Sequence, residues 1–304
     1  MKHTIKITLI LLAMFIVTQL IGLYVVNFYS LPGAALPYGL QNTPTENPGF
    51  SLLNFVIAFV VALAIFLILL RSKLSKWIIR IWMFLVVLLS LTISLGAFFN
   101  FSYSVYFVLA LSLVLSVLKI FKRDTIIHNF TELLIYPGIA VIFVSFFNIY
   151  TIAIVLVLIS IYDIYAVWHS GFMQKMATYQ IQEVKIFSGF FVPYLSKKQR
   201  EELKKYKLAA QKSKSLMRKG KQMKVNIAIL GGGDVVFPII TSGVVMLAWG
   251  LIPALIVTLG ATLALCYLFF VGEKRKFYPA MPYITTGIFI GMIVAWLVKT
   301  YLLG

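Results

Sequence analysis

The stretch that decides the fold runs from residue 225 to residue 250 and reads VNIAILGGGDVVFPIITSGVVMLAWG. A helix needs about 20 mostly apolar residues to cross the hydrocarbon core of a bilayer, so this stretch is long enough to span a membrane. Its only charged residue is Asp234. An aspartate at the centre of a span costs about 2.5–3.5 kcal/mol on insertion scales, and such residues are usually functional. We therefore treat Asp234 as a candidate site residue inside a membrane helix.

The composition of the whole chain is that of a membrane protein. Its 304 residues are 61% hydrophobic and 12% charged, with a mean hydropathy of +0.97, whereas a soluble domain is about 45–50% apolar. The single cysteine, Cys266, excludes a disulfide framework, a CxxC redox site and a zinc site built from thiolates. No HExxH motif is present either. We expect neither a metal nor a cofactor.

Apolar runs of similar length predict an all-α polytopic membrane protein with nine transmembrane helices. The first run is too long for the apolar region of a signal peptide, which usually has 7–15 residues, and no A-x-A site follows it directly. The predicted spans are 5–26, 50–70, 77–98, 103–120, 130–147, 149–168, 225–248, 250–271 and 283–303. The chain thus divides into helices 1–6 (residues 1–168), a basic loop (169–224) and helices 7–9 (225–304).

The basic residues predict the orientation of these spans. Of the 27 lysines and arginines, only Lys299 falls on one side of the predicted membrane, and the other 26 fall on the opposite side. Cytoplasmic loops carry the excess of basic residues. The pattern predicts a protein of the cell membrane with a cytoplasmic N-terminus, a cytoplasmic 169–224 loop and an external C-terminus.

The 169–224 loop is the longest hydrophilic stretch and contains a dense basic run from Lys197 to Lys224. We expect this run to lie near anionic lipid headgroups. Its lysine-rich part lacks interleaved aromatic residues of the kind that stack on nucleic-acid bases, so nucleic acid is not an expected partner. A short apolar segment precedes it and predicts an interfacial contact with the bilayer. That segment contains Phe187, Phe190, Phe191, Val192, Tyr194 and Leu195.

Two of the nine acidic residues fall well inside predicted spans, Asp163 in the sixth and Asp234 in the seventh, while Glu132 falls at the edge of the fifth. The two aspartates lie about five and nine residues from the cytoplasmic ends, roughly 8 and 14 Å deep at 1.5 Å per residue. The two spans are antiparallel, so the carboxylates can face each other and share one proton. Aspartic proteases use such a pair as general base and general acid.

The residues around these positions predict irregular backbone. Three glycines precede Asp234, and Pro238 follows it where its ring clashes with the Asp234 carbonyl. Residues 278–282, YPAMP, contain two prolines and predict an extended segment before the last span. Each feature also has a structural interpretation, because glycines and prolines are common at packed and kinked positions of membrane helices.

Three short motifs together resemble a known family. Tyr162-Asp163, the run from Gly231 to Asp234, and Pro279-Ala280-Met281 resemble the YD, GxGD and PAL motifs of presenilin and signal peptide peptidase. These proteins are intramembrane aspartyl proteases with nine spans. Met281 stands where the family usually has leucine, an exchange that nearly conserves volume. The orientation and the short loop are similar to those of microbial, particularly archaeal, presenilin homologues.

The resemblance implies that Asp163 and Asp234 are catalytic and that the other motif residues contact substrate. Those residues are Tyr162, Gly231, Gly233, Pro279, Ala280 and Met281. The expected substrates are single-span transmembrane proteins. A proton-coupled transporter or ion channel is the alternative, because intramembrane aspartates also relay protons, although no convincing internal repeat supports a transporter. Presenilin itself needs accessory subunits, and no pattern in this chain specifies a subunit or an oligomer.

Overall fold

The computed structural model describes residues 5–32, 75–99, 104–122, 124–169, 188–194, 226–272 and 278–302, together with isolated positions between 34 and 65. Eight helices in these ranges are long and apolar enough to cross a membrane. They correspond to eight of the nine predicted spans, and about two thirds of the predicted span 50–70 lies outside the described residues. The helices are α1 (Ile5–Ser30), α3 (Ser75–Phe98), α4 (Ser104–Phe121), α5 (Thr125–Val144), α6 (Ile149–Trp168), α10 (Gly232–Trp249), α11 (Leu251–Val271) and α12 (Met281–Leu302).

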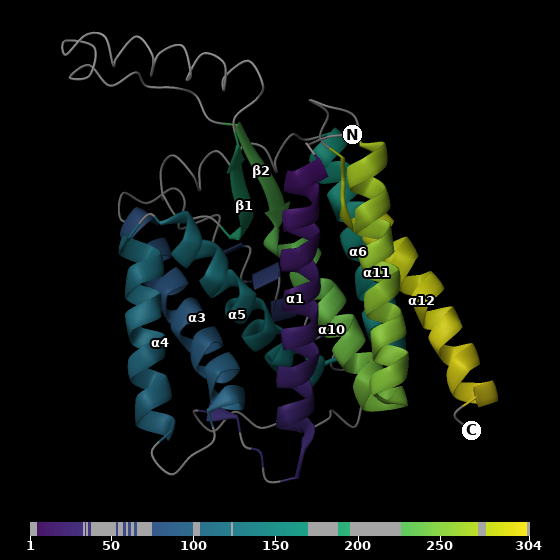
Figure 1. Cartoon of the computed structure of the whole chain (residues 1–304), viewed down its shortest axis with the longest axis horizontal. Helices are drawn as coiled ribbons and strands as arrows, with labels where there is room; N and C mark the ends of the chain where they lie inside the picture. The colour runs from purple at the N-terminus through teal and green to yellow at the C-terminus, as the bar shows by residue number, and fades with distance from the viewer. Residues whose placement is uncertain are drawn as a thin grey trace.

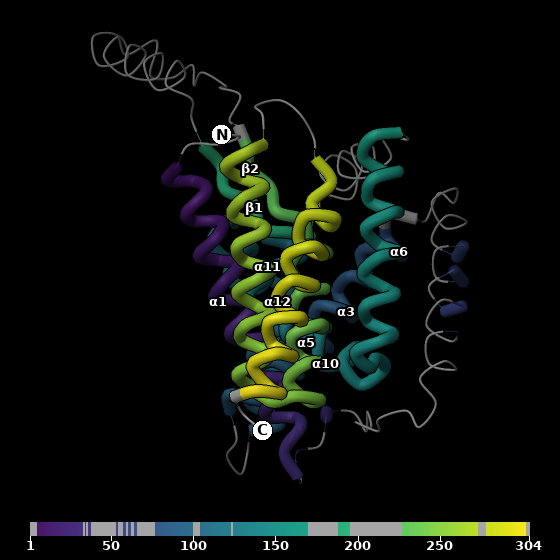
Figure 2. Tube along the Cα trace, turned by 90° about the vertical axis from the view of Figure 1, so that its right-hand side faces the viewer, coloured from purple at the N-terminus to yellow at the C-terminus, as the bar shows by residue number. Residues whose placement is uncertain are grey.

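The helices form one bundle in which α1, α5 and α10 lie between two outer groups (Figure 1). Helices α3 and α4 lie at one edge of the bundle, whereas α6, α11 and α12 lie at the other. In Figure 2, α12 lies between α11 and α6, and it packs against both of them as well as α10. The N-terminus and the C-terminus lie at opposite ends of the bundle.

Glycines allow several helix pairs to approach closely. A Cβ atom on Gly138 of α5 would overlap the backbone of Ser90 on α3, and one on Gly260 of α11 would overlap the backbone of Gly287 on α12. Small residues at such contacts let helices pack by van der Waals attraction where lipid offers no hydrophobic driving force. The bundle is therefore held together by close backbone packing along these pairs.

A two-stranded antiparallel sheet at the N-terminal end of the bundle is the main departure from the predicted fold. Strand β1 (Gly189–Tyr194) pairs with β2 (Asn226–Gly231), with Gly189 opposite Gly231. The prediction of an interfacial segment is wrong for Phe190, which is fully buried. The seventh span also starts at Gly232 instead of residue 225, because β-branched residues favour strands and glycines disfavour helix.

Candidate active site

Asp163 lies on α6, with only 5% of its surface exposed, and contacts the start of α12. Its Oδ2 atom accepts a hydrogen bond from the backbone N–H of Met281 at 3.0 Å, and the backbone N–H of Ala280 also interacts with this carboxylate. The first N–H groups of a helix have no partner inside that helix. The Asp163 side chain therefore caps α12 from a neighbouring helix.

The YPAMP segment is less extended than its two prolines predict. Helix α12 begins at Met281, and the carbonyl of Ala280 accepts its first described hydrogen bond, from the N–H of Ile284 at 3.1 Å. Proline is tolerated in a first helical turn because its missing N–H would be unpaired there. Pro282 thus lies inside the helix, and only residues 278–280 precede it as irregular backbone.

Asp234 is the third residue of α10 and lies in its first turn, so it is closer to the helix end than the predicted span implied. The helix is capped by Gly231 without any side-chain hydrogen bond. A Cβ atom on Gly231 would lie 3.0 Å from Asp234 Oδ2, which shows that the carboxylate folds back over Gly231. A carboxylate at this position is stabilised by the partial positive charge of the helix N-terminus.

The structure brings together the helices of the two aspartates. Helix α6 packs against α10, and α12 packs against both. The described hydrogen bond of Asp163 runs to Met281, so a direct pairing of Asp163 with Asp234 stays a prediction. The two carboxylates share one feature of their surroundings. Asp163 lies against the N-terminal end of α12, and Asp234 lies in the first turn of α10.

The motif residues around the aspartates differ in accessibility. Tyr162 is 51% exposed. Gly233 is exposed, and the nearest heavy atom to a Cβ there would be Phe237 Cε2 at 4.0 Å. By contrast, a Cβ on Gly232 would lie 2.9 Å from Ser188 Oγ and 3.0 Å from Tyr136 Oη. The face of the glycine run that carries Gly233 is therefore open, whereas the face of Gly232 is closed by other elements.

Comparison with known proteins decides the family. The family model described as signal-peptide peptidase, presenilin aspartyl protease, matches residues 12–300. The chain belongs to this family. It is an integral, multi-pass membrane protein and an aspartic endopeptidase of the intramembrane type.

Two solved structures share the fold of this presenilin-family protease. Both are of a presenilin family intramembrane aspartate protease, one in space group C222 and one in space group P2. Each is 18% identical with a TM-score of 0.60. The first alignment covers 96% of this chain and 99% of the other, and the second covers 95% and 96%. No curated protein matches the chain.

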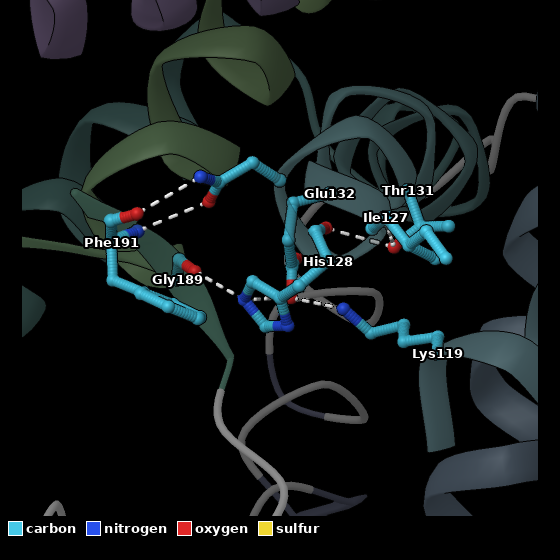
Figure 3. Close-up of polar contacts among 8 residues, drawn as sticks. Lys119, Ile127, His128, Thr131, Glu132, Gly189 and Phe191 are labelled. Atoms are coloured by element: carbon cyan, nitrogen blue, oxygen red, sulfur yellow. Dashed lines mark hydrogen bonds and ion pairs between the residues drawn. The ribbon is translucent and has the colours of Figure 1, made fainter. Parts of the chain in front are cut away.

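A buried polar cluster joins α4, α5 and β1 in this protease (Figure 3), and sequence reasoning missed it. Lys119 Nζ lies 2.5 Å from Glu132 Oε1, and the two side chains are only 2% and 1% exposed. His128 Nε2 lies 3.5 Å from the same Glu132 oxygen and 2.8 Å from the carbonyl oxygen of Gly189. Glu132 was expected at a span edge; instead, it is buried against protein together with His128.

Asn129 completes the link between α5 and β1. Its side-chain Nδ2 donates to the carbonyl of Phe191 at 2.9 Å, and its Oδ1 accepts from the N–H of Phe191 at 3.2 Å. The backbone of Phe191 is therefore bound to a side chain instead of to β2. The spacing of His128, Glu132 and Tyr136 by four residues places them on one helix face, which is the signal that sequence reasoning could have used. Among the described residues, no group of three or more His, Cys, Asp or Glu side chains could hold a metal ion.

Proposed function

We propose that this protease hydrolyses peptide bonds of single-span transmembrane proteins, with Asp163 and Asp234 as the general acid and base. The observation that supports this most directly is the placement of the two motif carboxylates on packed helices, each at a helix N-terminus. Intramembrane carboxylates are costly. Helix N-termini offset part of that cost without an oppositely charged side chain.

In the proposed reaction, one carboxylate takes a proton from water as the water oxygen bonds to the scissile carbonyl carbon. The other, protonated, carboxyl group gives its proton to the carbonyl oxygen. The tetrahedral intermediate then collapses and the carbon–nitrogen bond breaks. The leaving nitrogen receives a proton from the newly protonated carboxyl group, and one hydroxyl group of the intermediate returns its proton to the other carboxylate. One proton shared between the two aspartates is sufficient for this cycle.

A transmembrane substrate must unwind locally, because its peptide bonds are hidden in its own helix. The exposure of Tyr162 and of Gly233, each next to one of the aspartates, supports access of substrate backbone to the site. Asn129 binds the N–H and C=O groups of Phe191, so these groups point away from β2. In an antiparallel pair the residue opposite then points its own N–H and C=O groups away from β1, and here that residue is Ile229. A substrate strand added there would lead directly to Asp234.

The proposed role of Pro279, Ala280 and Met281 in substrate binding differs from that of the predicted extended segment. The N–H groups of Ala280 and Met281 interact with Asp163, so they are engaged by the enzyme itself. Their proposed role is to keep Asp163 beside the site while the irregular backbone of residues 278–280 borders the substrate.

The test is cleavage of a tagged single-span substrate by the purified full chain, compared with Asp163→Asn and Asp234→Asn. Both variants should lose cleavage and keep the melting temperature, because asparagine cannot exchange the proton that general acid–base catalysis needs. Asp124→Asn is the matched control. Asp124 caps α5 through its side chain, and asparagine caps equally well, so cleavage should persist.

Substantial cleavage by either active-site variant, with contaminating protease excluded, would refute the assignment. The wild-type rate should also show a bell-shaped dependence on pH. The pair of aspartates is inactive when both are deprotonated and when both are protonated. A rate that keeps rising into alkaline pH would contradict a shared proton. Proton flux through the wild-type protein in liposomes, without peptide cleavage, would favour a transporter instead.

We propose for the orientation that the N-terminus and the basic 197–224 run face the cytoplasm, where anionic lipid headgroups bind the run, and that the C-terminus is external. The opposite placement of the two chain ends in the bundle supports this (Figure 1).

A further inference from the structure

The turn that carries Asp234 lacks local rigidity. Gly231, Gly232 and Gly233 join β2 to α10, and the helix start has no side-chain cap. Glycine has the largest backbone freedom of any residue. The position of Asp234 therefore depends on contacts that other elements make with this turn.

Tyr136 of α5 makes the closest such contact from a membrane helix. It is 1% exposed, and a Cβ atom on Gly232 would lie 3.0 Å from its hydroxyl oxygen and 3.1 Å from its Cε1. Its ring packs edge to face on Phe190 of β1, with the ring centroids 5.5 Å apart. The Tyr136 hydroxyl also interacts electrostatically with Asp234. This side chain thus contacts β1 and the glycine turn, and it interacts electrostatically with the Asp234 carboxylate.

Tyr136 itself lies next to the buried polar cluster. Its hydroxyl lies beside the carboxylate of Glu132, one helical turn earlier, and beside the hydroxyl of Ser188, and both contacts are looser than a regular hydrogen bond. Lys119 supplies the opposite charge to Glu132. A buried carboxylate with its own counter-ion is a strong acceptor for a tyrosine hydroxyl. The chain of contacts therefore runs from Lys119 through Glu132 and Tyr136 to Gly232.

We propose that Tyr136, oriented by the Glu132–Lys119 pair, is a positioning residue that holds the glycine turn and thereby aims Asp234 at the substrate. This inference rests on the proposed catalytic role of Asp234. A misplacement of about 1 Å at a reacting group can lower a rate by about 100-fold. The effect should appear in kcat more than in KM, because the turn sets the geometry of the chemical step.

The first test is Tyr136→Phe, which removes the hydroxyl and keeps the ring on Phe190. We expect kcat to fall about tenfold or more, KM to change less than about twofold and the melting temperature to stay close to wild type. Tyr29→Phe is the matched control, because Tyr29 is also buried and donates a hydrogen bond to the Ile93 carbonyl at 2.9 Å, outside the site. Loss of the Tyr29 hydroxyl should lower the melting temperature at least as much as Tyr136→Phe does, and kcat should not change.

The second test separates positioning from charge burial. Single replacement of Lys119 or Glu132 leaves one buried charge unpaired and destabilises the fold, so both are changed together. Lys119→Met with Glu132→Gln keeps an acceptor for Tyr136 and should keep kcat close to wild type. Lys119→Met with Glu132→Leu removes the acceptor and should lower kcat as Tyr136→Phe does. Adding Tyr136→Phe to the second pair should then cause no further loss.

Wild-type kcat in Tyr136→Phe, or equal losses in Tyr136→Phe and Tyr29→Phe, would overturn the inference. Equal kcat in the two Lys119/Glu132 double variants would do the same. Two other outcomes would refute the proposed function itself. These are a wild-type protein that does not cleave the substrate, or an Asp234→Asn variant that still cleaves it. A chain in which both aspartates are essential and Tyr136→Phe is fully active refutes only the positioning role.

Discussion

Replacing Gly287 by alanine should damage both stability and cleavage, although this residue lies outside the active site. Helices α11 and α12 cross at Gly260 and Gly287 with their backbones in contact. A Cβ atom on Gly287 would overlap the carbonyl of Gly260 and lie 2.5 Å from the Cβ of Ala264. Carbon atoms normally approach to about 3.5–4.0 Å, so the two helices must separate by about 1 Å.

The consequence reaches Asp163 through α12. Forced overpacking costs about 1–3 kcal/mol. Met281 lies six residues before Gly287, about 9 Å along the helix axis, and its N–H donates to Asp163 at 3.0 Å. A displacement of about 1 Å would stretch this hydrogen bond beyond the usual limit of about 3.2 Å. We therefore expect cleavage to fall by about tenfold or more.

The assay measures thermal unfolding and substrate cleavage for a graded pair of α12 variants. Gly291→Ala is the milder member, because its Cβ would lie 3.0 Å from Val257 Cα. Ile293→Ala is the neutral control, since Ile293 is 61% exposed on the same helix. Wild-type stability and cleavage in Gly287→Ala, or a larger effect from Gly291→Ala, would refute the reasoning from close packing.

Three further predictions concern the site and the orientation. Asp163→Ala should lower the free energy of unfolding by about 0.5–2 kcal/mol relative to Asp163→Asn, because only asparagine still caps the Met281 N–H; equal denaturation midpoints would contradict this. Changing Pro279 and Pro282 together to alanine should let α12 extend and should greatly reduce cleavage, and a wild-type rate would mean that the segment is only a loop. Cysteines placed at 197–224 in a cysteine-free background should resist an impermeant reagent added to intact cells, and labelling from outside would overturn the cytoplasmic assignment.

Hydropathy predicts the helices well because crossing a membrane is a local requirement of length and composition. The start of α10 shows the limit of that argument. Residues 226–231 are as apolar as a helix would be, but they pair with β1, which begins 42 residues before Gly231. Such a pairing depends on a distant partner, and no window along the chain contains it. The predicted distance of Asp234 from the end of its helix was too great for the same reason.

The two catalytic candidates could be found from sequence because a carboxylate inside an apolar run is conspicuous. Their surroundings could not be found in this way. Asp163 contacts Met281, which is 118 residues away, and only the packing of α6 on α12 reveals that a carboxylate occupies the start of another helix. The distinct surroundings of the glycines also depend on tertiary packing, since Gly231 makes room for Asp234 while Gly232 borders Tyr136.

Glu132 shows why the rule for intramembrane carboxylates needs a packing argument as well as a depth. The sequence placed it only at the edge of a predicted span, yet it is buried beside Lys119, 13 residues earlier. Helices α4 and α5 pack against each other, and only residues 122–124 separate them along the chain. Residues at similar distances from this connection therefore come together. An ion pair so placed is costly to bury and contributes little net stability. Such a pair therefore fits the proposed role of holding Tyr136 against the turn of Asp234 better than a role in stability alone.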